Sequence, residues 1–263
     1  MNAHRLPQIR GLLGIILLAL QACTPVPSPT AEPVVETPEV TPIPLSQLVT
    51  LTGVSFREEG QAPVYVISAM TPMFSGVDHP HIQEFNETAH ALIQDQIAFF
   101  RENILTQMPA QRISSGSSFI VQYALISQRD SLWSFKFDFS GYTDGAPLPY
   151  RYNMTLNYDL EQGRELAINE LFPEDSDYLK VISRYCIAEL SKRNIGFFGG
   201  FQQGAEPTLD NYRDWNLAPD GLMITFDEMR VAPYSAGPQT VTVPFSVMET
   251  LIKPKSPLAL YKP

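Results

Sequence analysis

Residues 132–140 of this 263-residue chain read LWSFKFDFS, and this stretch decides the fold. Aromatic side chains at every second position alternate with polar or charged ones: Trp133, Phe135, Phe137 and Phe139 against Ser134, Lys136, Asp138 and Ser140. Successive side chains of a β-strand point to opposite faces of the sheet. The pattern therefore predicts a half-buried strand with one dry aromatic face and one wet polar face.

The segments on either side repeat this alternation. Before the quoted stretch it runs from Phe119 to Leu125, and after it from Tyr150 to Leu160. The short turn Arg129-Asp130-Ser131 separates the first two segments, so we expect them to pair antiparallel. Together the three segments predict a sheet whose aromatic face must be covered.

Two segments show helical spacing. Apolar residues three or four apart from Ile82 to Ile104 predict a long helix with one apolar face. The same spacing between Tyr178 and Asn194 predicts a second helix, in which Cys186 is a small core residue rather than a nucleophile. We expect this second helix to cover part of the aromatic face.

Further β-like runs lie at both ends of the chain. Two occur between Leu48 and Phe74, and three in the C-terminal third, where Pro219-Asp220-Gly221 is typical of a hairpin turn. We therefore predict an α+β fold: an antiparallel β-sheet with a long N-terminal helix and a second central helix packed on it. This domain should occupy residues 45–263, as one body or as two halves dividing near residue 145.

The first 22 residues have the order of a secretory signal. Two arginines, Arg5 and Arg10, precede an apolar stretch too short to span a bilayer permanently. The following Leu20-Gln21-Ala22-Cys23 resembles a bacterial lipobox, in which the cysteine takes a diacylglycerol and becomes the first residue after cleavage. We expect residues 1–22 to be a signal peptide and Cys23 to anchor the chain in a lipid bilayer, facing the cell envelope.

Residues 23–44 are rich in proline and contain no aromatic residue, which predicts an extended, semi-rigid tether. Without the signal, 16 basic residues face 28 acidic ones. That charge argues against a nucleic-acid partner and mildly favours a basic one, such as a basic envelope protein.

Three stretches carry a family resemblance: residues 66–104, which resemble the family's N-terminal half, and two more specific ones. Residues 153–172 read NMTLNYDLEQGRELAINELF, and residues 214–247 read DWNLAPDGLMITFDEMRVAPYSAGPQTVTVPFSV. They resemble a domain shared by the extracytoplasmic part of the lysozyme-sensing anti-sigma factor RsiV and the accessory domain of PdaC-type peptidoglycan deacetylases. The resemblance covers nearly all of residues 60–250. It implies an envelope domain that binds a lysozyme-like protein or peptidoglycan.

The chain departs from this family in one loop. Members often carry a histidine between the second and third central strands, where this chain reads Asp144-Gly145-Ala146-Pro147-Leu148-Pro149. A role that depends on that imidazole is therefore not carried over. No cytoplasmic anti-sigma segment precedes the lipobox, so sigma-factor binding is not implied.

No catalytic or metal-binding motif is evident, and we expect no cofactor. His79, His81 and His90 lie within twelve residues, but no carboxylate or cysteine completes a usual zinc spacing, which favours solvent-facing histidines. Ser114–Ser118 is typical of a flexible loop rather than a nucleophile elbow. The acidic run Glu174–Asp177 precedes the second helix, where it is expected to cap the helix.

Candidate binding residues fall into two groups. Phe197, Phe198 and Phe201 lie among residues that favour loops; they either present a binding surface or fold back onto the core. Tyr142, Asp144 and Arg151 flank the loop that departs from the family, and Arg151 shares the polar faces of the central strands with Asn153 and Asn157.

These observations favour a membrane-anchored, non-catalytic binding or sensing module for an envelope protein or a cell-wall glycan. The alternative is a cell-envelope hydrolase that uses a carboxylate pair. Strongly perturbed carboxylates clustered in a deep cleft would favour the hydrolase, and a flat face with exposed aromatics would favour binding.

Overall fold

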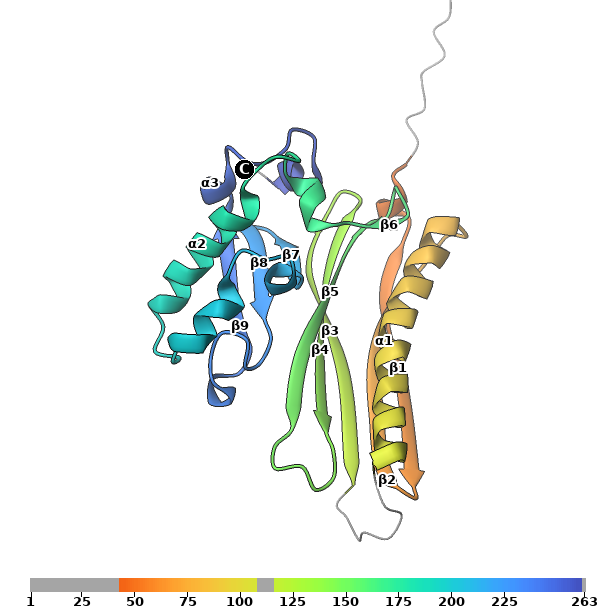
Figure 1. Ribbon diagram of the computed structural model, residues 1–263. Coiled ribbons are helices and arrows are strands. Elements are labelled where there is room, and N and C mark those ends of the chain that lie inside the picture. The colour runs from red at the N-terminus through yellow and green to blue at the C-terminus, as the bar shows by residue number, and fades with distance from the viewer. Residues whose placement is uncertain (1–42, 108–115, 262–263) are drawn as a thin grey trace, which may run out of the picture. The chain divides into compact units, whose positions relative to one another are not determined.

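The computed structural model describes residues 43–107 and 116–261 (Figure 1). The predicted signal peptide, Cys23 and all but the end of the tether lie outside these residues, as do Ser114 and Ser115. Every element described below belongs to one compact unit, Pro42–Pro263. No helix among the described residues is both long and apolar enough to cross a membrane.

The main sheet has six strands that follow one another in sequence order. They are β1 (Thr50–Gln61), β2 (Val64–Ser75), β3 (Ser117–Arg129), β4 (Leu132–Tyr142), β5 (Tyr150–Asp159) and β6 (Arg164–Glu165). Neighbouring strands are antiparallel, as expected, except that β2 and β3 pair in parallel from Tyr65↔Ser117 to Ala69↔Val121. Parallel pairing follows because the long helix lies between these strands and returns the chain to the end where β2 began.

That helix, α1 (Pro80–Gln107), covers the aromatic face of the sheet (Figure 1). Its apolar stripe packs on the alternating aromatic row of β4, so the predicted dry face is confirmed. Asn86 fixes the helix to β2: its Nδ2 donates to the Phe74 carbonyl at 2.9 Å, and its Oδ1 accepts from the Phe74 amide at 2.8 Å.

A row of stacked rings crosses this core from the helix to the surface. Phe100 of α1 stacks on Phe119 at a centroid distance of 4.9 Å, and Phe119 on Phe139 at 6.1 Å. Phe139 then stacks on Tyr152 at 4.8 Å, and Tyr152 on Tyr150 at 6.4 Å. Phe100 is 3% exposed and Tyr150 is 38% exposed, so this aromatic row begins in the core and ends at solvent.

The C-terminal strands form a separate sheet. It consists of β7 (Trp215–Ala218), β8 (Gly221–Phe226) and β9 (Gln239–Pro244), and it packs against α2 (Tyr178–Ser191) and α3 (Phe245–Met248). The predicted turn at Pro219-Asp220-Gly221 joins β7 to β8. Short 3-10 helices complete the unit: η1 (Leu45–Gln47), η2 (Ile168–Leu171), η3 (Gly199–Ala205), η4 (Asp210–Tyr212), η5 (Tyr234–Ala236) and η6 (Pro257–Tyr261).

The α+β class is confirmed, but the predicted place of the second helix is wrong. α2 packs on β9 and α3, in a second core, because α1 already fills the aromatic face of the main sheet. Cys186 lies fully buried in this second core, as predicted, and burial raises the pKa of its thiol to about 12. Apart from Leu132 of β4, which belongs to the second core, residues up to Leu160 form the first core and residues from Leu166 onward form the second.

Buried hydrogen bonds join the two sheets. The Asn157 side chain donates to the Trp215 carbonyl at 2.7 Å and accepts from the Leu217 amide at 3.2 Å. Ser134 Oγ also donates to Asn157 Oδ1, at 2.6 Å, and Asn216 Nδ2 donates to the Phe135 carbonyl at 2.8 Å. Directional bonds of this kind hold the second sheet in one position against β4 and β5.

Candidate functional site

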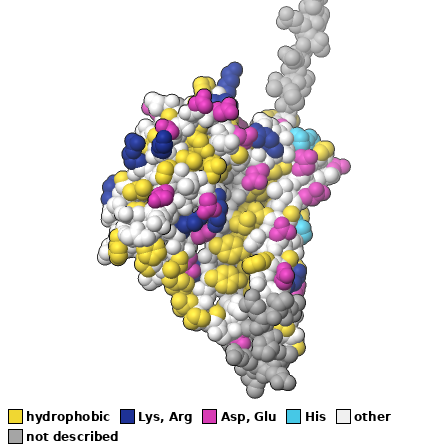
Figure 2. All heavy atoms as spheres, in the orientation of Figure 1, with side chains coloured by type: hydrophobic (Ala, Val, Ile, Leu, Met, Phe, Trp, Pro, Cys, Tyr) yellow, Lys and Arg dark blue, Asp and Glu magenta, His cyan; other side chains and the backbone are white. Residues whose placement is uncertain are grey.

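A pocket of about 470 Å³ lies where the two sheets and α1 meet. On the face shown in Figure 2, apolar side chains and a group of charged ones gather beside this junction. The pocket is lined by Gln96 of α1, four consecutive residues of β5 and two residues at the start of the second sheet: Tyr152, Asn153, Met154, Thr155, Arg213 and Asp214. Its volume is within the usual range for small-molecule sites.

The exposed end of the aromatic row forms one side of the pocket. The ring of Tyr152 is nearly parallel to that of Phe139, at 2°, and its hydroxyl donates to Gln96 Oε1 at 2.9 Å. Tyr150 adjoins it and lies across Gly141, where a Cβ would come within 2.1 Å of the ring. Stacking and this hydrogen bond fix a flat, partly exposed aromatic surface before any ligand arrives.

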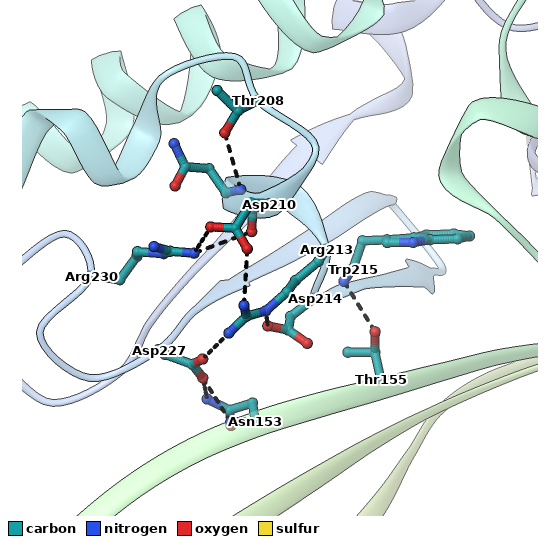
Figure 3. A network of polar contacts seen from close by, with 10 residues as sticks. Asn153, Thr155, Thr208, Asp210, Arg213, Asp214, Trp215, Asp227 and Arg230 are labelled. Atoms are coloured by element: carbon teal, nitrogen blue, oxygen red, sulfur yellow. Dashed lines mark hydrogen bonds and ion pairs between the residues drawn. The ribbon is translucent and has the colours of Figure 1, made fainter. Parts of the chain in front are cut away.

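An ion network forms the opposite side (Figure 3). The Arg213 guanidinium contacts three carboxylates: Asp210 at 3.1 Å, Asp214 at 3.2 Å and Asp227 at 3.0 Å. Asp210 also pairs with Arg230, whose guanidinium holds the pKa of that carboxyl below its usual range. The network therefore contains three carboxylates and two guanidiniums.

The edge of β5 crosses the floor of the pocket. Among the described residues its only strand partner on this side is β6, at Tyr158 and Asp159. Further along the edge, Asp227 Oδ1 accepts from the backbone amide of Asn153 at 2.7 Å and from its side chain at 3.1 Å. The Asp227 side chain thus takes the hydrogen bond that a neighbouring strand would otherwise make. This contact attaches the second sheet to the open edge of β5.

Asp214 is the most perturbed carboxyl at the site. It is only 8% exposed, and burial, together with the negative charge of Asp227, raises its pKa to about 6 despite the opposing Arg213. Arg213 Nε donates to its Oδ2, whereas its Oδ1 accepts no hydrogen bond from any residue that the structure describes. A buried carboxylate with one open oxygen on a pocket wall is a ready acceptor for a ligand's donor.

The carboxylates of Asp214 and Asp227 are both engaged by other side chains. A glycosidase needs two carboxyl groups that both face the scissile bond. Here Arg213 forms ion pairs with both Asp214 and Asp227, and the Asn153 amide also donates a hydrogen bond to Asp227. No group of three potential metal ligands occurs within residues 43–107 and 116–261.

The second group of predicted binding residues, Tyr142, Asp144 and Arg151, does not line this pocket. Arg151 is exposed on β5, next to both tyrosines of the aromatic row. Tyr142 and Asp144 are half-buried where β4 ends, and the Asp144 amide donates to Ser117 Oγ at 2.9 Å. Of the polar residues noted on the central strands, Asn153 lines the pocket and Asn157 joins the sheets.

The structure separates the three phenylalanines. Phe197 folds back into the second core at 8% exposure, whereas Phe198 is 70% exposed and Phe201 is half-buried. Phe198 and Phe201 line a shallower pocket of about 370 Å³ with Met229 and Arg230. Phe197 thus folds back onto the core, whereas a binding role for the exposed Phe198 stays a prediction.

The histidines and the acidic run have local roles. His81 Nδ1 lies 3.2 Å from the Leu160 carbonyl, and its ring lies 4.7 Å from that of His79, while His90 is exposed. Asp177 occupies the N-cap of α2, but its side chain makes no capping hydrogen bond and pairs with Lys180 at 2.8 Å instead. The expected capping by this carboxylate is therefore wrong.

Sequence reasoning missed most of the pocket. Tyr152 was noted only as part of an alternating strand, and Gln96, Arg213, Asp214 and Asp227 were not singled out. Asp214 and Asp227 nevertheless lie in the resemblance stretch at residues 214–247, on either side of the β7–β8 hairpin. Asp214 comes just before β7 and Asp227 just after β8, its hairpin partner. This spacing could have predicted that the two carboxylates lie side by side.

Comparisons with known proteins agree with this fold. Residues 169–246 match the family model described as "Protein of unknown function (DUF3298)". The peptidoglycan-N-acetylmuramic acid deacetylase PdaC of Bacillus subtilis is 29% identical over 101 residues, which are 38% of this chain and 22% of that enzyme. The chain thus spans less than a quarter of the enzyme's length.

Two solved structures share the architecture. A crystal structure of a DUF3298 family member from Bacteroides fragilis superposes with a TM-score of 0.58 at 13% identity, covering 81% of this chain and 97% of the other. One from Pseudomonas aeruginosa gives 0.57 at 14% identity, covering 78% and 95%. Residues 169–246 of this chain thus match the DUF3298 model, and this match together with the match to PdaC confirms the resemblance drawn from the sequence.

Proposed function

We propose that this protein is a non-catalytic binding module of the bacterial cell envelope, and that its ligand is a cell-wall glycan. A lipid on Cys23 and the proline-rich tether 23–44 hold the module at the membrane, outside the cytoplasm. The exposed end of the aromatic row carries the proposal, because Tyr150 and Tyr152 form a flat apolar surface beside a polar pocket.

This combination matches the chemistry of a sugar ring. One face of a pyranose presents polarised C–H groups, which the negative face of an aromatic ring attracts. Its hydroxyls and amides need hydrogen-bond partners at the rim, and Gln96, Arg213 and Asp214 lie there. The match to an enzyme named as a peptidoglycan deacetylase supports a wall glycan over other sugars.

A hydrolase remains the second candidate, because Asp214 has the raised pKa of a general acid at the rim of a pocket. In that case purified protein would release reducing ends or free amines from peptidoglycan, and Asp214→Asn would abolish the release. Binding without either product would favour the module.

The test is sedimentation of fragment 42–263 with isolated peptidoglycan, with a second arm in which immobilised lysozyme is the bait. The fragment contains both cores and is a compact unit by itself. We expect it to pellet with the glycan, and the double variant Tyr150→Ala/Tyr152→Ala to remain in solution.

Phe198→Ala is the matched control, since it removes an exposed aromatic ring at a different pocket. If Phe198→Ala abolishes sedimentation and the tyrosine variant does not, the assigned site is wrong. Retention on lysozyme but not on glycan would replace the proposed ligand with an envelope protein.

A further inference from the structure

Asp214 offers the pocket an acceptor that the protein leaves open. Its backbone carbonyl accepts from the Thr225 amide at 2.8 Å, which holds the residue in place just before β7 begins. One carboxylate oxygen is taken by Arg213 at 3.2 Å, and the other accepts nothing from any residue in the described ranges. The Asp214 side chain is 11% exposed at the wall of the pocket, so bulk water reaches this oxygen only in part.

The charge around this oxygen is also unbalanced. Asp210, Asp214 and Asp227 face Arg213 and Arg230, which leaves one negative charge in excess. Gln96, Tyr152, Asn153, Met154 and Thr155, the other residues that line the pocket, bring no charge. A ligand with one positive charge would complete the network, because charge-assisted hydrogen bonds are the strong ones.

We propose that this pocket selects sugars with a free amino group: the ring stacks on Tyr150 and Tyr152, and its ammonium donates to Asp214 Oδ1. This inference rests on the proposed function and names its ligand class, an amino sugar without its N-acetyl group. An N-acetylated sugar carries no charge there and brings an acyl group into the same space.

The experiment measures the affinity of fragment 42–263 for two probes, the tetramer of glucosamine and the tetramer of N-acetylglucosamine. Because hydrogen bonds to charged groups are stronger than neutral ones, we expect the amino tetramer to bind about tenfold more tightly, which is about 1.4 kcal/mol. Asp214→Asn should reduce this preference to within about twofold, because the isosteric amide cannot pair with the ammonium.

Controls separate this effect from general attraction of a cation to an acidic protein. Asp175→Asn removes one exposed negative charge away from the pocket and should keep the full preference. Tetralysine has positive charge but no sugar ring, so it should bind weakly to the unmodified fragment and to the Asp214→Asn variant alike. On the unmodified fragment, the NMR shift of the Asp214 carboxyl carbon should move with the amino tetramer alone, which tests the contact without a substitution.

Each outcome decides the proposal. Equal affinity for both tetramers, or a preference that survives Asp214→Asn, overturns the amino-sugar inference and leaves glycan binding in place. Binding of neither tetramer nor of isolated peptidoglycan overturns the proposed function as well. If the fragment prefers the amino tetramer, and Asp214→Asn removes this preference while Asp175→Asn keeps it, the result supports the amino-sugar inference and the proposed function.

Discussion

The ring of Tyr150 lies directly over Gly141 of the neighbouring strand, so close that a Cβ at position 141 would come within 2.1 Å of it. An aromatic ring over a cross-strand glycine is a known way to fill the space that the missing side chain leaves. In this chain the pair also determines where the aromatic row ends, so the glycine positions part of the proposed binding surface.

Gly141→Ala should therefore weaken glycan binding without unfolding the protein. The new methyl group forces the Tyr150 ring outward; losing one stacking contact costs about 1 kcal/mol, or about fivefold in affinity. Titration calorimetry with a glycan oligomer measures this. Gly60→Ala is the control, because Gly60 lies equally close under the ring of Tyr65, at the β1–β2 hairpin and outside the pocket. Equal losses in both variants would contradict a local role for Tyr150.

Asp214 should make the fold less stable as the pH rises through the weakly acidic range. Its pKa is raised from 3.8 to about 6, so between these values the folded state holds a proton that the unfolded chain has released. The free energy of unfolding therefore falls with rising pH, by about 3 kcal/mol once the carboxyl is fully ionised. Urea unfolding between pH 4 and pH 7 should show this fall reduced in Asp214→Asn and retained in Asp175→Asn.

Truncating two adjacent phenylalanines should change the stability of the protein by very different amounts. Phe197→Ala leaves a cavity in the second core and should cost about 3 kcal/mol of stability. Phe198→Ala exposes little that was buried and should change stability by less than about 0.5 kcal/mol. Thermal unfolding of the two variants makes the comparison; a large loss in Phe198→Ala would show that its ring packs against the protein in solution.

The buried amide of Asn157 should be essential to the joint between the sheets. Asn157→Ala leaves the Trp215 carbonyl and the Leu217 amide without partners, at a cost of about 3 kcal/mol. Hydrogen exchange should then rise in β7 before it rises in β3. Asn169→Ala, at an exposed position, should leave both stability and exchange unchanged.

The alternating strands and the long helix could be predicted because each depends on a local period. The row of aromatic residues in β4 faces α1 as its spacing required, and Cys186 is buried as its helical neighbours indicated. The parallel joint between β2 and β3 and the position of α2 could not be predicted, since both depend on which surfaces other elements have already covered.

The pocket was beyond sequence reasoning for a similar reason. Tyr152 and Asp214 are 62 positions apart in the sequence and belong to different sheets. They meet because Asn157 and Asp227 dock the second sheet onto β5, and no local pattern predicts that docking. The family resemblance covered both stretches, but it did not show that they face each other.

The five-residue parallel ladder between β2 and β3 has a consequence for how the main sheet comes apart. On one side of it, β1, β2 and α1 hold together through a hairpin and helix packing, and on the other side β3, β4 and β5 form a continuous meander. The ladder joins segments about fifty residues apart, so loop-closure entropy opposes it more than it opposes either neighbouring group. Transient opening along this seam must also break the contacts that α1 makes across it, Phe85 with Phe135 of β4 and Phe100 with Phe119 of β3, so these rings keep the two groups of strands together.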